Sequence, residues 1–195
     1  MNELRAAVVG AGRLGALHAR KYAAMAGVKL ACVVDIDPER ARAVAAETGA
    51  VALTDYRQLA GRVEMASIAA PAVEHHRIAC ALMSLRIDVL LEKPMAASLA
   101  EARNLAAAAA DSGRILQIGH LERFNPAIVR LRRLLRAPRF VECHRLAPFT
   151  ERGADVDVVL DLMVHDLDVL LTVAPASVSS VEAIGVAVLT DRIDV

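Results

Sequence analysis

Three glycines near the N-terminus have the spacing of a loop that binds phosphate. Gly10, Gly12 and Gly15 form a G-x-G-x-x-G pattern between an apolar run and a segment of helical period. In a dinucleotide site the first glycine permits a tight turn, the second lets a pyrophosphate approach the backbone, and the third lets the helix lie close to the sheet. The pyrophosphate then lies at the positive end of the helix dipole. The predicted cofactor-binding residues of this loop are Gly10, Ala11, Gly12, Arg13, Leu14 and Gly15.

An acidic residue beyond the loop favours one form of the cofactor. Asp35 ends the second apolar run, twenty positions after Gly15, and is followed by Ile36. Its carboxylate would accept hydrogen bonds from the adenosine ribose and repel a 2′-phosphate, which predicts NAD in preference to NADP. Arg40 is close enough in sequence to soften that preference. The alternative is a glycine-rich turn that binds nothing, with Asp35 as a helix cap.

A lysine follows the fifth apolar run. Glu92, Lys93 and Pro94 would lie at the carboxyl edge of the sheet, where open α/β folds bind their ligands. An ammonium can donate to a substrate hydroxyl and can lose its proton when desolvated, whereas a guanidinium stays charged. The alternative is an ordinary surface ion pair between Lys93 and Glu92.

Polar side chains repeat along one apolar helix nearer the C-terminus. They are Asp157, Asp161, His165 and Asp168, whose spacings of four, four and three place them on one helical face. Neighbouring carboxylates make an imidazole hold its proton more tightly, which suits a group that alternates between base and acid. The stripe either lines a site or forms the solvated side of the helix. Asp161 and His165 have the spacing of a metal half-site, but no complementary ligand cluster accompanies them, so no metal is predicted.

Short apolar strands alternate with longer helices in the part of the chain that positions these residues. The predicted strands are residues 6–9, 28–34, 50–53, 65–69, 88–91 and 114–118, and the predicted helices are residues 14–26, 38–47, 56–60, 73–85 and 99–111. Such βα repeats with right-handed crossovers predict an α/β fold with a doubly wound parallel sheet.

The pattern changes after residue 138. Residues 127–136 and 158–173 are predicted as helices, residues 140–146 and 178–189 as strands, and residues 148–157 as a polar loop. Two strands are too few for an independent sheet domain. The sequence therefore predicts a Rossmann dinucleotide-binding domain over residues 1–120 and part of an α+β domain over residues 121–195.

Composition excludes several classes of function. The chain has 23 Lys and Arg against 23 Asp and Glu, so its zero net charge offers no general attraction to nucleic acid or to anionic membranes. Aromatic residues make up 3% of the 195 residues, too few for platforms that stack single-stranded nucleic acid. The N-terminus lacks a signal-peptide pattern, and no apolar run is long enough to span a bilayer. The three cysteines lie apart within apolar runs, so we expect buried thiols in a soluble, cytoplasmic protein.

Together, these motifs resemble the Gfo/Idh/MocA family of nicotinamide-dependent oxidoreductases. The resemblance rests on the glycine loop, Val34-Asp35, Ala70-Pro71 followed by His75, Glu92-Lys93-Pro94, and Asp161 with His165. In that family the lysine touches the substrate and the nicotinamide ribose, while the aspartate and histidine bind and deprotonate the reacting hydroxyl. The resemblance implies cofactor contacts from Asp35, Ile36, Ala70, Pro71, His75, Glu92 and Lys93, and a catalytic set of Lys93, Asp161 and His165.

Two further stretches, residues 119–126 and 148–153, are similar to the branch of the family that acts on nucleotide sugars. This similarity implies a sugar or nucleotide-sugar substrate whose contacts are Arg123, Phe124, Asn125, Arg152 and His165. Two alternatives stay open. One is a non-sugar carbonyl or imine substrate, and the other is a truncated, catalytically silent module that binds a dinucleotide or serves as an interaction subunit.

The chain departs from the family pattern in places. Ala70 stands where Thr or Ser often precedes the proline, and Arg86 stands where a glycine commonly turns the chain into the fifth strand. Family members also continue into a broad antiparallel sheet that covers the substrate and forms the oligomer interface. The resemblance therefore implies a homo-oligomer formed through that sheet in a full-length chain.

Overall fold

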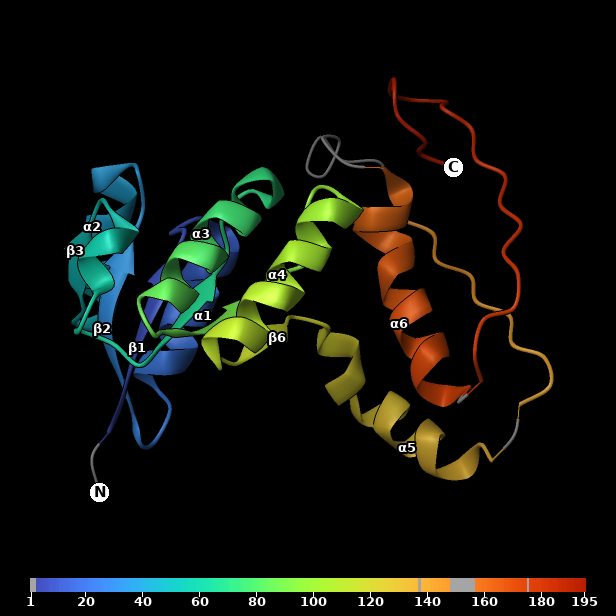
Figure 1. The fold of residues 1–195 in the computed structure, drawn as a ribbon, viewed down its shortest axis with the longest axis horizontal. Coiled ribbons are helices and arrows are strands. Elements are labelled where there is room, and N and C mark those ends of the chain that lie inside the picture. Colours follow the sequence, from blue (N-terminus) through green and yellow to red (C-terminus); the bar gives the residue numbers. More distant parts are fainter. Residues whose placement is uncertain (1–2, 137, 148–156, 175) are drawn as a thin grey trace. The chain divides into compact units, whose positions relative to one another are not determined.

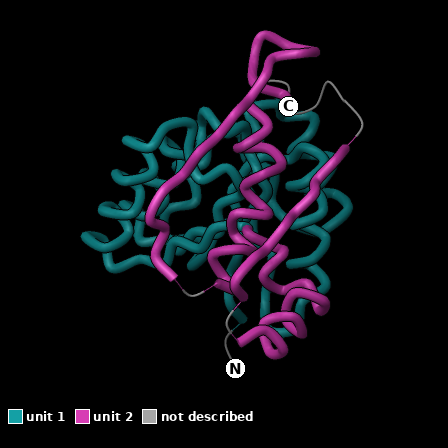
Figure 2. The backbone as a smooth tube through the Cα atoms, turned by 90° about the vertical axis from the view of Figure 1, so that its right-hand side faces the viewer, with its two compact units in different colours: residues 1–119 teal, residues 120–195 magenta. Residues whose placement is uncertain are grey.

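The computed structural model of the protein describes residues 3–136, 138–147, 157–174 and 176–195. The chain divides into two compact units, Met1–Gly119 and His120–Val195, called unit 1 and unit 2 below (Figure 2). The sequence places the predicted domain boundary after residue 120.

Unit 1 is a six-stranded parallel sheet in the order β3-β2-β1-β4-β5-β6, with helices on both faces (Figure 1). The strands are β1 (Leu4–Val9), β2 (Val28–Val34), β3 (Val51–Leu53), β4 (Met65–Ile68), β5 (Asp88–Leu91) and β6 (Leu116–Ile118). The helices are α1 (Arg13–Ala23), α2 (Pro38–Thr48), α3 (Ala72–Ser84) and α4 (Leu99–Ser112), with a 3₁₀ turn η1 (Tyr56–Leu59). The predicted doubly wound α/β sheet is confirmed.

Successive residues of β1 face opposite sides of the sheet. Ala6 and Val8 belong to a core with residues of α1 and α2, whereas Ala7 and Val9 belong to a core with residues of α3 and α4. A strand segment that is buried on both faces must be apolar throughout. This explains why apolar and polar residues do not alternate over Ala6–Val9 of β1. The strand order reverses direction between β1 and β4, so the point where ligands bind in such sheets lies at the carboxyl ends of these two strands.

Arg86 adopts the backbone conformation that glycine favours. Its φ is 63°. Its N–H donates to the Met83 carbonyl, and the N–H of Ile87 donates to the Leu82 carbonyl, both at 3.0 Å, which is the Schellman ending of a helix. Arg86 therefore keeps the turn into β5 that a glycine would make, with the strain of a left-handed non-glycine residue.

Unit 2 contains η2 (Leu121–Phe124), α5 (Pro126–Leu134), the π-helical turn η3 (Val159–Met163) and α6 (Val164–Val173). The predicted helix over residues 158–173 is present, but its first part is π-helical instead of α-helical. The two predicted strands are wrong, since residues 140–146 and 178–189 have no strand structure. In the described part of unit 2 neither segment has another strand beside it to take up its backbone N–H and C=O groups. Leu146 and Ile184 are accordingly 94% and 97% exposed.

The cysteines differ in their exposure. Cys32 is buried, but Cys143 is exposed, so the expectation of buried thiols is wrong for Cys143. The cause is local, because Cys143 lies in the segment that does not form its predicted strand. Across the ranges that the structure describes, no helix combines the length and apolar character needed to cross a membrane.

Candidate cofactor and catalytic site

The glycine loop joins β1 to α1, and its glycines have different surroundings. Gly10 has a φ of +94°, and a Cβ there would lie 2.6 Å from the Ala69 carbonyl oxygen. A Cβ at Gly15 would lie 1.7 Å from the Gly10 carbonyl oxygen, so α1 approaches the strand too closely for any side chain. A Cβ at Gly12 would meet no atom within 4 Å. Gly10 thus permits the tight turn after β1, and Gly15 permits the close approach of α1 to that turn. Gly12 borders open space.

The N-terminus of α1 has the features of an anion site. Gly12 precedes the helix and provides no side-chain cap, and the first turn contains no acidic residue. The positive end of this 11-residue helix therefore faces the open space beside Gly12. Ala11 is buried, whereas Arg13 and Leu14 start the helix with exposed and half-buried side chains. The loop fits the pyrophosphate of a dinucleotide.

Asp35 lies directly after β2 and is 7% exposed. Its Oδ2 accepts the N–H of Ala11 at 2.7 Å, and its Oδ1 accepts the N–H of Asp37 at 2.9 Å. The Arg40 guanidinium lies 3.2 Å from Oδ1. Ile36 is 87% exposed and presents an apolar surface beside this carboxylate. Asp35 thus ties the glycine loop to the end of β2, and Arg40 is already in contact with the group that would bind the ribose.

Glu92, Lys93 and Pro94 follow β5, at the same edge of the sheet as the glycine loop and Asp35, because all the strands are parallel. Glu92 is 6% exposed, and Lys93 is half-buried. Oε1 of Glu92 lies 3.1 Å from Nε2 of His18. The Lys93–Pro94 peptide is cis.

His75 connects two strand ends. It is 1% exposed, its Nδ1 lies 2.8 Å from the Pro94 carbonyl oxygen, and its Nε2 lies 2.9 Å from the Ala70 carbonyl oxygen. The half-buried Ala70 and the exposed Pro71 form the turn from β4 into α3. The ring of His75 is therefore occupied by backbone carbonyls, and cofactor contact by Ala70, Pro71 and His75 stays a prediction.

Asp161 and His165 lie on consecutive turns of the long helix of unit 2, Asp161 in η3 and His165 in α6. Single π-helical turns recur at functional sites. The exposed positions of this helix are apolar and four residues apart, namely Val159, Met163, Leu167 and Leu171. The polar stripe is thus not the exposed side of the helix, which argues against its interpretation as a solvated face.

Asp168 continues this stripe and is 6% exposed. Both of its oxygens accept Nε–H of Arg123 at 2.9 Å, and Nδ1 of His120 lies 3.9 Å from Oδ1. The hydrogen bonds to Asp168 raise the pKa of Arg123 above its ordinary value, with burial acting in the opposite direction. The pair joins η2 to α6.

The predicted substrate-binding residues differ in their contacts and in their exposure. Arg123 holds Asp168, Phe124 is 72% exposed, and Asn125 caps α5 by accepting the N–H of Ala127 at 3.0 Å. Arg152 lies outside the described residues. Substrate binding by Arg123, Phe124, Asn125 and Arg152 stays a prediction. The residues that the structure describes contain no group of three or more His, Cys, Asp or Glu side chains that could hold a metal ion.

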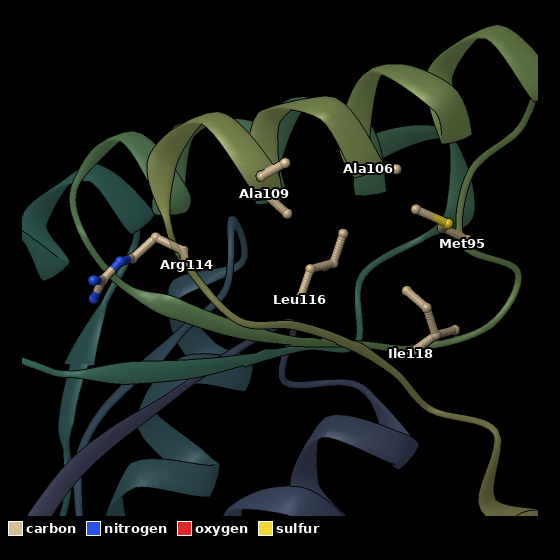
Figure 3. A pocket seen from close by; sticks show the side chains of 7 residues that line it. Met95, Ala106, Ala109, Arg114, Leu116 and Ile118 are labelled. Atoms are coloured by element: carbon tan, nitrogen blue, oxygen red, sulfur yellow. The ribbon is translucent and has the colours of Figure 1, made fainter.

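A hollow in unit 1 lies between α4 and β6 (Figure 3). It is lined by Met95, Ala106, Ala109, Ala110, Arg114, Leu116 and Ile118. Leu116 points toward α4, and the guanidinium of Arg114 points away from the hollow. The lining provides no carboxylate or imidazole for acid–base chemistry, so the hollow is not part of the candidate site.

His18 is not among the predicted site residues, although its ring lies against Glu92. A sequence signal for it exists. The face of α1 that packs on the sheet buries Gly15, Ala19 and Tyr22. Helical spacing places His18 on the same side, and a polar residue there needs a buried partner.

Residues 4–120 match a family model, GFO_IDH_MocA, described as an oxidoreductase family with an NAD-binding Rossmann fold. The chain belongs to this family. Its glycine loop, Asp35 and Glu92-Lys93-Pro94 all lie within the matched residues, in the unit whose sheet brings them to one edge.

Gfo/Idh/MocA relatives extend the comparison over the whole chain. UDP-N-acetylglucosamine 3-dehydrogenase of Acidithiobacillus ferrooxidans is 42% identical over 195 residues, which are 100% of this chain and 62% of that protein. A solved structure of that enzyme matches with a TM-score of 0.92 over 64% of its chain. Inositol 2-dehydrogenase 1 of Saccharopolyspora erythraea is 35% identical over 86% of this chain and 53% of that protein.

A further solved structure contains the cofactor. The structure of GenD2 from gentamicin A biosynthesis, in complex with NAD, is 28% identical, with a TM-score of 0.73 over 89% of this chain and 54% of that one. The chain thus spans less than two thirds of the length of these relatives.

Proposed function

We propose that the protein is an NAD-dependent dehydrogenase that oxidises a secondary alcohol of a nucleotide sugar such as UDP-N-acetylglucosamine. One observation carries the proposal: the glycine loop with open space at Gly12, the buried carboxylate of Asp35 and the side chain of Lys93 lie at one edge of the same sheet. The 42% identity to a UDP-N-acetylglucosamine 3-dehydrogenase supports the choice of substrate.

The residues have distinct roles in this reaction. The positive end of α1 holds the pyrophosphate, and Asp35 accepts hydrogen bonds from the adenosine ribose. When bound, nicotinamide supplies the hydride acceptor. Lys93 donates a hydrogen bond to the reacting oxygen. His165, beside Asp161, takes the hydroxyl proton as hydride leaves the carbinol carbon, so one oxidised carbonyl and one proton are produced. Correct positioning of the carbinol carbon supplies much of the rate.

Two finer features belong to the same proposal. NAD is preferred over NADP because the buried Asp35 carboxylate would repel a 2′-phosphate. A full-length chain also forms a homo-oligomer through its C-terminal sheet, and unit 2 exposes large apolar side chains such as Phe140, Leu146 and Ile184. Light scattering on a purified full-length chain tests the second point, and a monomer at micromolar concentration would contradict it.

Reduction of NAD in the presence of UDP-N-acetylglucosamine, followed by the absorbance of the reduced nicotinamide, tests the activity. Replacing an essential acid–base group costs about 100-fold or more in turnover, so we expect that loss in Lys93→Met and in His165→Asn. Lys29→Met and His144→Asn are matched controls, because both side chains are exposed and lie outside the site. Wild-type turnover in both site variants would refute the catalytic assignment.

A second candidate function is dinucleotide binding without turnover. It is favoured by the location of the glycine loop, Asp35 and Lys93 in unit 1, together with the absence of the two predicted strands from the described part of unit 2. Calorimetric binding of NAD with no turnover on UDP-N-acetylglucosamine, inositols or other sugars would support it. Turnover by the 195-residue chain would eliminate it.

A further inference from the structure

A buried polar cluster connects three elements of unit 1. His18 belongs to α1, Ser67 to β4, and Glu92 to the turn after β5. The side chains of His18 and Glu92 are 14% and 7% exposed, and Ser67 is fully buried. Nδ1 of His18 contacts the Ser67 hydroxyl, and Nε2 lies 3.1 Å from Oε1 of Glu92. A single imidazole therefore bridges the cluster.

The chemistry of these groups sets the direction of the contacts. An ionised carboxylate only accepts hydrogen bonds, so Nε2 of His18 directs its proton toward Glu92. In the neutral imidazole, Nδ1 then accepts the Ser67 hydroxyl proton. The contact with Oε1 of Glu92 is close but not well aligned as a hydrogen bond, so its attraction is chiefly electrostatic. This imidazole is the polar group that lies against Oε1 of the buried Glu92 carboxylate, and its N–H dipole offsets part of the cost of that burial.

The backbone around Glu92 leaves its side chain little room. A Cβ at Gly119 would lie 3.0 Å from Oε1 and 3.1 Å from Oε2, so the carboxylate packs directly on the backbone after β6. On the other side of Lys93, Nδ1 of His75 lies 2.8 Å from the Pro94 carbonyl oxygen. Lys93 thus stands between two residues that are each in contact with a largely buried histidine.

The end of β5 belongs to the nicotinamide side of the site. β2, which leads to Asp35, lies on one side of β1, whereas β4 and β5 lie on the other. In a doubly wound sheet the two halves of a dinucleotide bind on opposite sides of the switch point. Because Asp35 has the adenosine half, Glu92 and Lys93 have the nicotinamide half.

We propose that His18 is a positioning residue for the nicotinamide half of the site, which fixes the Glu92 carboxylate and through it the place of Lys93. The inference rests on the proposed function, because it concerns the same site. His18 acts through Glu92 and does not itself touch the substrate. If the pair of His18 and Glu92 only stabilised the fold, its loss would weaken every ligand of the site equally.

NADH and ADP-ribose distinguish these two roles, because ADP-ribose has the adenosine and the pyrophosphate but no nicotinamide. Calorimetry on the 195-residue chain compares wild type, His18→Leu, His18→Gln and the control His76→Leu. His76 is a suitable control because its ring contacts Asn104, between α3 and α4, at 2.7 Å. The leucine control thus also removes a histidine contact, but at a place away from Glu92.

The expected result separates the ligands. His18→Leu weakens NADH binding about tenfold, as expected for the loss of one contact to a charged group, and leaves the affinity for ADP-ribose within about twofold. The fluorescence of bound NADH changes in the same variant, because it reports the surroundings of the nicotinamide. His18→Gln restores most of the NADH affinity, since its amide places an N–H donor near the position of Nε2. His76→Leu behaves as wild type.

Ser67→Ala provides a second route if His18→Leu does not fold. It removes the hydroxyl that contacts Nδ1 of the ring, and we expect about threefold weaker NADH binding with unchanged ADP-ribose binding. Equal weakening of both ligands, or unchanged NADH affinity in every variant, would overturn the proposal. A wild-type chain that binds both ligands but oxidises no sugar would refute the proposed function alone, and the comparison of ligands would still decide the role of His18. A wild-type chain that binds neither ligand would overturn both.

Discussion

Replacing Gly12 with alanine separates cofactor binding from folding. A Cβ at this position meets no protein atom within 4 Å, and its φ of −69° suits alanine, so Gly12→Ala changes the free energy of unfolding by less than about 1 kcal/mol. The same Cβ would occupy the space in which the pyrophosphate approaches the backbone. Overpacking of about 1–3 kcal/mol would raise the Kd for NAD about 5- to 150-fold.

Thermal unfolding with and without NAD measures this effect. At a concentration 100 times the wild-type Kd, NAD stabilises the protein by about 2.7 kcal/mol, which raises the Tm by about 5–11 °C for a chain of this length. With affinity reduced 100-fold, the stabilisation is about 0.4 kcal/mol and the shift about 1–2 °C. Gly61→Ala is the matched control, because Gly61 also borders open space but has a φ of +71°. It should lower the Tm and keep the full NAD shift. A full NAD shift in Gly12→Ala would refute the assignment of the loop.

Three further substitutions test other features. Asp35→Ser removes the carboxylate and releases Arg40, so we expect weaker NAD binding and tighter NADP binding, each by about tenfold, and unchanged discrimination in binding assays would contradict this. Arg86→Gly relieves the left-handed strain and raises the free energy of unfolding by about 0.5–1 kcal/mol in denaturant melts, whereas Arg86→Ala does not. Arg123→Met leaves the buried Asp168 carboxylate without its partner. The cost of about 3–5 kcal/mol for such a loss falls to about 1–2 kcal/mol because the Arg123 side chain is 47% exposed. Hydrogen exchange in α6 should then accelerate, and wild-type exchange rates would show that the pair does not hold this helix.

The sheet of unit 1 could be predicted because each of its signals is local. Each strand is a short, mainly apolar run, and the central strands are buried on both faces, which requires that composition whatever the neighbouring strands are. The strand ends then place the glycine loop, Asp35 and Lys93 at one edge without any knowledge of side-chain contacts. The cofactor half of the candidate site is therefore accessible from the sequence.

Unit 2 is harder to predict because an apolar segment becomes a strand only where a neighbouring strand accepts and donates its backbone hydrogen bonds. Residues 140–146 and 178–189 have the apolar composition of strands, but composition alone supplies no neighbour for their backbone groups. The periodicity of residues 158–173 likewise predicts an α-helix and cannot indicate a π-helical turn. That turn alters the relation of Asp161 to His165, because a wider turn rotates the residues before it about the helix axis.

The histidines show where sequence reasoning about a site must stop. The place of His75 after Ala70 and Pro71 predicts a cofactor contact, yet both of its ring nitrogens contact backbone carbonyls. His18 is indicated only by its place on the sheet-facing side of α1, and its ring lies against a carboxylate 74 positions away in sequence. Contacts of this kind leave no periodicity, because they depend on which helix covers which strand. A polar residue at a helix position that the sequence predicts to face the core therefore indicates a residue that positions a site. Burial of such a residue requires a hydrogen-bond partner, and only the fold determines which residue that partner is.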